Sequence, residues 1–298
     1  MILFVGELLA DLITEEPFES AENFILRVGG SPGNIAKFLA QLGVPTRVLA
    51  RVGNDPIGKR IVNNLSKRGV DVSHIQYDDL NGTTIVFVQR TKLTPDFFVI
   101  RGADRFLKSP NDDVFSGVKI VHFSCWPFTV SPIREVALDI LERLGKHGII
   151  LGFDPNCREK LFPCGRIDME TIRFVLERAE IIKPSIDDAI ALFGQYNGSL
   201  EDKVRYYLDK FHQCGVKKVV LTAGPYGAFV SENGDIRRIP TFATNVVDAT
   251  GAGDGFWAGL YYGILKGQSL FEACCTGSKV AAQVLSQIGA DVEVKLDT

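Results

Sequence analysis

Short apolar runs alternate with longer amphipathic segments along most of the chain. The short runs are rich in Val, Ile and Leu and have the length of buried strands, whereas the longer ones carry apolar residues at helical spacing. We predict strands at Ile2–Gly6, Thr46–Val52, Lys119–Ser124, Ile149–Asp154, Glu180–Lys183 and Lys218–Thr222. We predict helices at Pro32–Leu42, Ile57–Arg68, Pro132–His147, Met169–Arg178, Leu200–Cys214, Ala252–Lys266 and Ser269–Gln287. This alternation indicates an α/β fold with a mostly parallel sheet covered by helices on both faces.

Two segments, residues 11–28 and 83–101, interrupt the alternation. They contain strand-like runs at Phe24–Val28, Thr84–Gln89 and Asp96–Ile100, with a turn around Leu93 to Pro95. We expect these runs to pair antiparallel and to form a small β lid outside the main sheet. Such a lid could exclude water from a site beneath it, and the alternative is a β extension that makes a dimer interface. No linker-like stretch divides the sequence, so residues 1–298 are expected to form one domain.

The composition narrows the classes of partner. The formal net charge is −3, hydrophobic residues make up 46% and charged residues 23%, and basic residues never occur in runs longer than two. These values disfavour a nucleic-acid partner. The six cysteines contain no C-x-x-C pair and no apolar stretch approaches the ~18 residues of a membrane span, so a cytoplasmic protein without a membrane partner is expected.

The strongest local motif is the glycine-rich turn within Asn245–Gly267, which precedes a predicted helix. Glycines let the backbone approach a ligand, and the unpaired N–H groups of a helix N-terminus favour an anion. Asp254 lies at this helix N-terminus. Its negative charge beside a bound anion would be unfavourable unless the carboxylate has a function such as accepting a proton. Capping of the helix by Asp254 is the alternative.

A second motif near the N-terminus completes a family pattern. The segment Val28–Gly43 contains G-G-x-x-x-N-x-A-x-x-L-A-x-L-G, and the later turn reads D-x-T-G-A-G-D. In order and separation, the two resemble the signatures of the ribokinase-like (PfkB) carbohydrate kinases, and the similarity spans nearly the whole chain. The resemblance implies a three-layer α/β/α sandwich with a β lid, and an enzyme that uses ATP and Mg²⁺.

The resemblance also implies roles for the glycine-rich turn. Asp254 would be the catalytic base. In the turn that begins at Gly251, the N–H groups of Ala252, Gly253 and Asp254 would form an anion hole for the transferred phosphoryl group. Asp248 and Thr250 match positions that form a monovalent-cation site, for K⁺, in several relatives. The chain departs from the common D-T-x-G-A-G-D by having Ala249 after Asp248, which bears on the cation site rather than on the base.

Further positions match residues that bind the nucleotide in this family. For several of them the alternative is a structural role: forming a turn, capping a helix or placing a charge in the first turn of a helix. Asp188 replaces the glutamate of the family's N-x-x-E motif and would hold a hydrated Mg²⁺, and Arg158 would contact the transferred phosphate or the substrate. The implied ATP-binding residues are Thr222, Gly224, Gly227, Gly251, Gly253, Asn156, Lys183, Ser185 and Ser278.

On the sugar side, the resemblance implies that Asp11, Gly30, Asn34 and Arg101 bind the substrate, together with Asp254. It favours a fructokinase that phosphorylates a primary hydroxyl of a ketose. The alternatives are a 2-keto-3-deoxygluconate kinase and a nucleoside or aminoimidazole riboside kinase. Keto-acid kinases commonly have a tyrosine two residues before the lid arginine, where this chain has Val99, and this difference favours a neutral ketose.

Two interpretations assign the chain to other classes of protein. The chain could be a sugar sensor that binds without turnover, or a structural α/β domain whose glycines only form turns. The intact Asp254 and its three neighbouring glycines favour an enzyme over both. A homodimer through the β lid is expected from relatives and from the apparent β extension.

Overall fold

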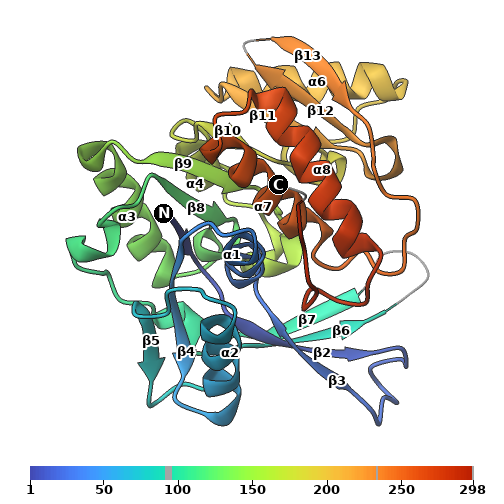
Figure 1. Cartoon of the computed structure of the whole chain (residues 1–298). Helices are drawn as coiled ribbons and strands as arrows, with labels where there is room; N and C mark the ends of the chain where they lie inside the picture. Colours follow the sequence, from blue (N-terminus) through green and yellow to red (C-terminus); the bar gives the residue numbers. More distant parts are fainter. Residues whose placement is uncertain (91–95, 233, 297–298) are drawn as a thin grey trace.

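Two β-sheets of unequal size organise the chain (Figure 1). The structure is a computed structural model that describes residues 1–90, 96–232 and 234–296, so the predicted turn around Leu93 to Pro95 lies outside the described residues. The larger sheet has nine strands within these ranges, in the order β13-β12-β11-β10-β9-β8-β1-β4-β5. Its strands are β1 (Ile2–Val5), β4 (Thr46–Gly53), β5 (Ile75–Asp78), β8 (Ile120–Ser124), β9 (Ile150–Asp154), β10 (Ile181–Ile182), β11 (Lys218–Thr222), β12 (Ala228–Glu232) and β13 (Asp235–Ile239).

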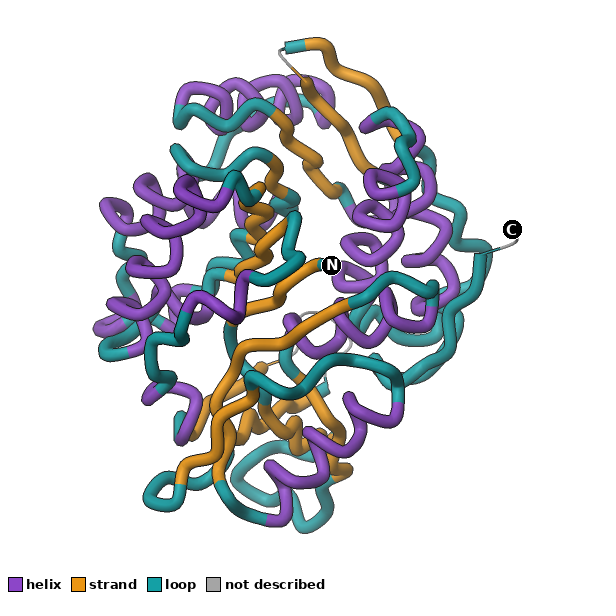
Figure 2. The backbone as a smooth tube through the Cα atoms, turned by 60° about the vertical axis from the view of Figure 1, so that its left-hand side comes forward, coloured by secondary structure: helices purple, strands orange, loops and turns teal. Residues whose placement is uncertain are grey.

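From β5 to β11 all neighbouring strands are parallel, and β12 and β13 extend one edge as an antiparallel hairpin. Helices lie on both sides of the strands, as Figure 2 shows. They are α1 (Ser31–Gln41), α2 (Pro56–Lys67), α3 (Ile133–His147), α4 (Met169–Leu176), α5 (Ile186–Phe193), α6 (Leu200–Gln213), α7 (Ala252–Leu265) and α8 (Leu270–Leu285). Short 3₁₀ turns lie at Ala103–Phe106, Asp112–Phe115, Trp126–Phe128, Glu159–Leu161, Pro163–Gly165 and Gly224–Tyr226.

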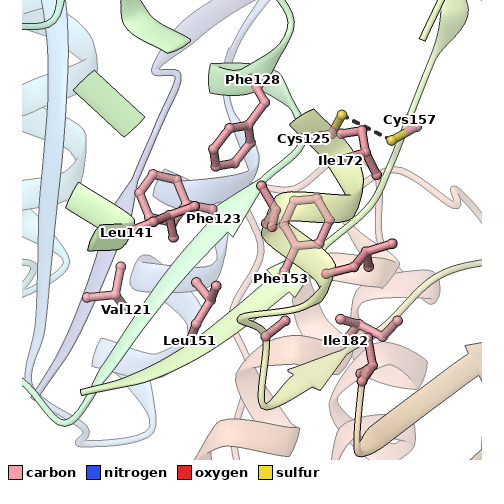
Figure 3. Packing of buried hydrophobic residues seen from close by; sticks show 14 of the residues in the cluster. Val121, Phe123, Cys125, Phe128, Leu141, Leu151, Phe153, Cys157, Ile172 and Ile182 are labelled. Atoms are coloured by element: carbon pink, nitrogen blue, oxygen red, sulfur yellow. Dashed lines mark hydrogen bonds between the residues drawn. The ribbon is translucent and has the colours of Figure 1, made fainter. Parts of the chain in front are cut away.

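Alternation along the strands divides the core into two layers. In β1, Leu3 and Val5 pack in a cluster with α3 to α6, whereas Ile2 and Phe4 pack in a second cluster with α1, α2, α7 and α8. Figure 3 shows part of the first cluster, in which Leu141 of α3 lies beside Phe123, and Phe153 comes from the neighbouring strand. The predicted α/β sandwich is therefore confirmed.

The smaller sheet has the order β3-β2-β6-β7 and combines the two segments that interrupt the alternation. Its strands are β2 (Leu9–Thr14), β3 (Ile25–Gly29), β6 (Ile85–Gln89) and β7 (Asp96–Ile100). The expected antiparallel pairing is correct for β2–β3 and β6–β7, but β2 and β6 pair in parallel. The strands β1 and β5 run in the same direction in the main sheet, and the chain continues from them into β2 and β6. The strands β2 and β6 therefore also run in the same direction.

Candidate active site

A cavity of about 450 Å³ lies between the smaller sheet and the carboxyl ends of the parallel strands. Strands of the smaller sheet contribute Leu9, Asp11, Val86 and Phe97. The N-terminal ends of α1 and α7 face the cavity, as does the loop after β9. The remaining lining residues are Glu7, Gly30, Ser31, Asn34, Trp126, Asp154, Asn156, Arg158, Leu161, Lys183, Ser185, Asp188, Thr222, Thr250, Gly251, Gly253 and Asp254.

Asp254 joins the two sequence motifs in space. Helix α7 has Gly251 as its N-cap and no side-chain cap bond, so the Asp254 carboxylate does not cap its own helix. It accepts hydrogen bonds from Ser31 Oγ (2.7 Å) and Asn34 Nδ2 (2.9 Å) in the first turns of α1. Loss of hydration raises the pKa of Asp254 to about 6, against the lowering effect of these two hydrogen bonds. A carboxylate with this pKa can accept a proton near neutral pH.

The first turn of α7 offers donors beside this carboxylate. The Ala252 N–H donates to the Ala249 carbonyl at 3.2 Å, whereas the N–H groups of Gly253 and Asp254 have no acceptor among the described residues. The Lys183 ammonium group lies 3.5 Å from where a Gly253 Cβ would be. Two backbone donors and one cation thus meet at a helix N-terminus, which is a favourable arrangement for an anion. Of the predicted anion-hole residues, Ala252 is the one already engaged in the turn.

Lys183 is held by a buried polar cluster under this turn. Its Nζ lies 3.2 Å from Asp154 Oδ2, which also accepts a hydrogen bond from Trp257 Nε1 at 2.8 Å. Asp154 ends β9 and Lys183 follows β10, so the parallel strands bring the pair together at their carboxyl ends. The cluster fixes the ammonium group toward the cavity.

The loop after β9 places Asn156 and Arg158 in the cavity wall. Asn156 has a positive φ of 27°, which is rare for a residue other than glycine. Arg158 Nη1 lies 3.5 Å from Asp188 Oδ1.

Asp188 caps α5 with one carboxylate oxygen and turns the other toward Arg158. Its Oδ2 accepts bonds from the Ser185 N–H (2.8 Å) and Oγ (2.7 Å) in a capping box that begins α5. Its Oδ1 is buried and has no hydrogen-bond partner among the described residues. Burial and the charge of Asp154 raise the pKa of Asp188. A buried carboxylate oxygen in this cavity, with Arg158 at 3.5 Å and no hydrogen-bond partner among the described residues, leaves room for a water of a hydrated Mg²⁺, which commonly keeps several waters. No cluster of three or more acidic, His or Cys ligands occurs in the described part of the chain.

The other residues predicted to bind ATP differ in whether they line this cavity. Thr222 lines it, and Gly224 lines an adjoining hollow of about 320 Å³ that shares Ser185 and Thr222 with it. Gly227 closes the turn between β11 and β12. Ser278 in α8 donates to the Pro240 carbonyl at 2.9 Å and lines neither hollow.

Asp248 and Thr250 lie together just before α7. Thr250 N and Oγ1 both donate to Asp248 Oδ1, at 2.9 and 2.7 Å, while Asp248 Oδ2 faces Arg90. Thr250 lines the cavity and Asp248 does not.

On the sugar side, Asp11, Gly30 and Asn34 line the cavity. Loss of hydration and the charge of Asp254 raise the pKa of Asp11 to about 7. A Cβ at Gly30 would lie 2.4 Å from the Glu7 carbonyl oxygen, so only glycine permits this close approach.

Arg101, the fourth predicted sugar residue, does not line the cavity. Its Nη2 and Nε donate to Asp104 Oδ2, at 2.6 and 3.1 Å, and its Nη1 donates to Thr129 Oγ1 at 2.6 Å. Its guanidinium group lies 4.5 Å from the ring of Trp126, which does line the cavity. Arg101 therefore contacts Trp126, a residue of the cavity wall, without lining the cavity itself.

Sequence reasoning missed Glu7, Ser31 and Trp126. Glu7 accepts bonds from Ser31 N (3.2 Å) and Ser124 Oγ (3.1 Å), and burial raises its pKa to about 8. Glu7 directly follows a buried strand and Ser31 lies inside the first motif, so strand-end position could have identified both. Trp126 follows the carboxyl end of β8 by two residues, so the same position could have identified it.

The chain belongs to the pfkB family of carbohydrate kinases, whose family model matches residues 1–295. The predicted ATP-dependent carbohydrate kinase and its ribokinase-like fold are thereby confirmed. An ATP-dependent 6-phosphofructokinase from Thermoanaerobacterium thermosaccharolyticum is 34% identical over 297 residues, covering 98% of this chain and 90% of the relative. No helix in the described part of the chain is long and apolar enough to cross a membrane.

Solved fructokinase structures are similar over nearly the whole chain. The Halothermothrix orenii fructokinase superposes with a TM-score of 0.83 at 30% identity, covering 96% of this chain and 98% of that one. A Vibrio cholerae fructokinase with fructose, ADP and calcium bound gives a TM-score of 0.83 at 25% identity, covering 97% and 94%.

Proposed function

We propose that the protein transfers the γ-phosphoryl group of ATP to a primary hydroxyl of a neutral ketose, and that fructose is its preferred substrate. The observation that carries the proposal is the juxtaposition of a raised-pKa carboxylate, Asp254, with the free N–H groups of a helix N-terminus. The first can accept the hydroxyl proton, and the second can hold the negative charge of the transferred group.

The transfer follows from these positions. Asp254 removes the proton as the hydroxyl oxygen bonds to the γ-phosphorus, and the bond from that phosphorus to the ADP oxygen breaks. The N–H groups of Gly253 and Asp254 and the Lys183 ammonium group stabilise the transferred phosphoryl oxygens. Mg²⁺, when bound through water to Asp188, would supply further positive charge to the phosphates. Asn156, Arg158, Thr222 and Gly224 are proposed to contact ATP.

The charge of the cavity wall supports a neutral sugar. Among the described lining residues, the cations are Arg158 and Lys183, and both come from the carboxyl ends of main-sheet strands. The part lined by the smaller sheet presents Asp11 with apolar Leu9, Val86 and Phe97. A substrate carboxylate or a second phosphate placed there would face the Asp11 carboxylate. A ketose would donate hydroxyl hydrogen bonds to Asp11.

The test is ADP release from Mg-ATP with fructose, fructose 6-phosphate, 2-keto-3-deoxygluconate, ribose and aminoimidazole riboside. We expect fructose to give the highest kcat/KM. We expect Asp254→Asn to lower kcat by at least about 100-fold while sugar binding, measured by calorimetry, persists. Asp209→Asn is the matched control because it makes the same change on the exposed face of α6.

Other outcomes contradict specific parts of the proposal. A higher kcat/KM for the keto acid or for fructose 6-phosphate would reject the neutral-sugar assignment. Equal turnover by wild type and Asp254→Asn would reject the base assignment, and binding without any turnover would favour a sensor.

We further propose that the enzyme works in the cytoplasm as a homodimer. All six cysteines are free thiols, which suits a reducing compartment. The face of the smaller sheet that points away from the cavity is apolar, with Phe87 stacked on Phe98 at 4.6 Å, and Phe98 and Ile100 are 45% and 56% exposed. Exposed apolar faces of this kind are typical of protein interfaces.

A further inference from the structure

An arginine side chain contacts the carboxylate that the family resemblance assigns to a monovalent cation. Arg90 Nη2 donates to Asp248 Oδ2 at 2.7 Å, and the two side chains are 32% and 12% exposed. Arg90 follows β6 directly, and its own N–H donates to the Thr14 carbonyl at 2.8 Å, at the end of the neighbouring strand β2. The smaller sheet therefore fixes the backbone from which this guanidinium reaches the glycine-rich turn.

The remaining contacts of Asp248 leave no place for a cation. Oδ1 accepts two bonds from Thr250, from its N–H at 2.9 Å and its hydroxyl at 2.7 Å. Oδ2 accepts the Gly289 N–H at 2.9 Å in addition to the Arg90 bond. A carboxylate offers about four lone-pair positions, and four donors already use them. A bound K⁺ would have to displace a donor and would also face the guanidinium charge.

We propose that Arg90 takes the place of the monovalent cation, so that this kinase needs no K⁺ for turnover. The inference rests on the proposed kinase function and concerns the same site. Arg90 is a positioning residue: it neutralises Asp248, Asp248 orders Thr250, and Thr250 leads into Gly251 at the N-cap of α7. The positive charge that would otherwise come from solution is supplied by the smaller sheet itself.

The first experiment uses the wild-type enzyme. ADP release is measured with fructose in KCl and in tetramethylammonium chloride, both at about 100 mM so that ionic screening is equal. We expect kcat to differ by less than about twofold between the salts. A rise of about tenfold or more in KCl overturns the proposal, because it would show that a cation site operates despite Arg90.

The second experiment removes the guanidinium. In tetramethylammonium chloride we expect Arg90→Gln to lower kcat by about tenfold or more, and KCl to restore a large part of the loss, because the variant exposes Asp248 Oδ2 to a cation. A merely structural role for Arg90 would not produce rescue by K⁺. Arg60→Gln is the control, since Arg60 is an exposed arginine of α2 that does not line the cavity. Wild-type turnover by Arg90→Gln in the absence of K⁺ also overturns the proposal.

A melting experiment tests cation binding without turnover. K⁺ that binds the folded chain raises its Tm, and we expect a rise of about 2 °C or more for Arg90→Gln and almost none for wild type. A rise as large in wild type as in the variant overturns the proposal. If no sugar supports turnover, the proposed function fails, while the melting comparison still decides whether Arg90 excludes the cation.

Discussion

Besides Asp188, three carboxyl groups along the cavity wall have pKa values above their ordinary range. Values for Glu7, Asp11 and Asp254 are about 8, 7 and 6, and loss of hydration is the largest cause for each. Each group therefore ionises at a higher pH in the folded chain than in the unfolded chain. Folding thus favours their protonated forms, whereas the proposed proton transfer needs Asp254 ionised.

The pKa of Asp254 predicts the acidic limb of the pH–rate profile. Only the ionised carboxylate can take the proton, so kcat/KM should rise with pH and level off above an apparent pKa near 6. The measurement is kcat/KM for fructose across the acidic and neutral range at saturating Mg-ATP. A limb near pH 4, the ordinary range for Asp, would contradict the raised pKa.

The pKa of Glu7 predicts a pH-dependent gain in stability for Glu7→Gln. Between the ordinary pKa of 4.5 and about 8, only the unfolded chain ionises Glu7, so wild-type stability falls as pH rises. The loss is up to about 1.4 kcal/mol per pH unit, and glutamine avoids it while still bonding Ser31 and Ser124.

Denaturant unfolding at about pH 5 and about pH 8.5 checks this difference. Glu7→Gln should exceed wild type clearly at the higher pH and nearly match it at the lower pH. An equal difference at both would show that Glu7 has an ordinary pKa in the folded chain.

At the scale of elements, helices α7 and α8 meet through glycines. A Cβ at Gly259 of α7 would lie 2.6 Å from the Thr276 carbonyl oxygen and 2.7 Å from the Cα of Gly277 in α8. Backbone atoms cannot move aside as a flexible side chain can, so the helices must separate to admit even a methyl group. The position of α7 matters because its N-terminal turn carries Asp254.

We therefore expect Gly259→Ala to destabilise the fold by about 1–3 kcal/mol and to reduce turnover. Gly145→Ala in α3 is the matched control, because nothing lies within 4 Å of its added Cβ. There the substitution should be neutral or slightly stabilising, by about 0.5–1 kcal/mol, through the higher helix propensity of alanine. Chemical denaturation compares both variants with wild type, and equal stabilities would contradict the close packing.

Elements with strong periodicity were predictable from the sequence, and those defined by pairing were not. The six predicted strands and seven predicted helices correspond to elements of the structure, because burial on both faces of a sheet or on one face of a helix leaves a clear pattern. The sequence did not reveal α5, which has eight residues, the strands β2 and β5, or the edge hairpin of β12 and β13. The parallel pairing of β2 and β6 depends on the path of the main-sheet strands, which no local pattern encodes.

The same distinction holds in the site. Asp254, Asn34 and Lys183 were predictable because each lies in a motif or at a strand end. Arg90 was not, because its contact with Asp248 joins segments 158 residues apart. Arg101 shows the converse, since its motif gave no sign that Asp104 and Thr129 would hold its guanidinium.

At the scale of the whole molecule, the outer face of the smaller sheet determines the proposed assembly. Leu12, Leu26, Phe87, Phe98 and Ile100 share this face, since Val86 and Phe97 on the alternate positions line the cavity. Burying such a face against a second copy would remove its apolar side chains from water.

We expect light scattering to give twice the 32.8 kDa mass of one chain for the wild type. Phe98→Asp should shift the mass to that of a monomer, because a charge would be buried in an apolar interface. Asp235→Asn, at an exposed position on the distant strand β13, should leave the mass unchanged. A monomeric wild type would contradict the dimer.

The hydrogen bonds from Ser31 and Asn34 to Asp254 join residues 223 and 220 positions apart. During synthesis, the first motif leaves the ribosome long before the residue that completes the site with it. A nascent chain can therefore form its early strands and helices while remaining unable to consume ATP. With Asp254 as the proposed base, turnover requires that these two distant parts of the polypeptide have come together, so activity reports that step of folding.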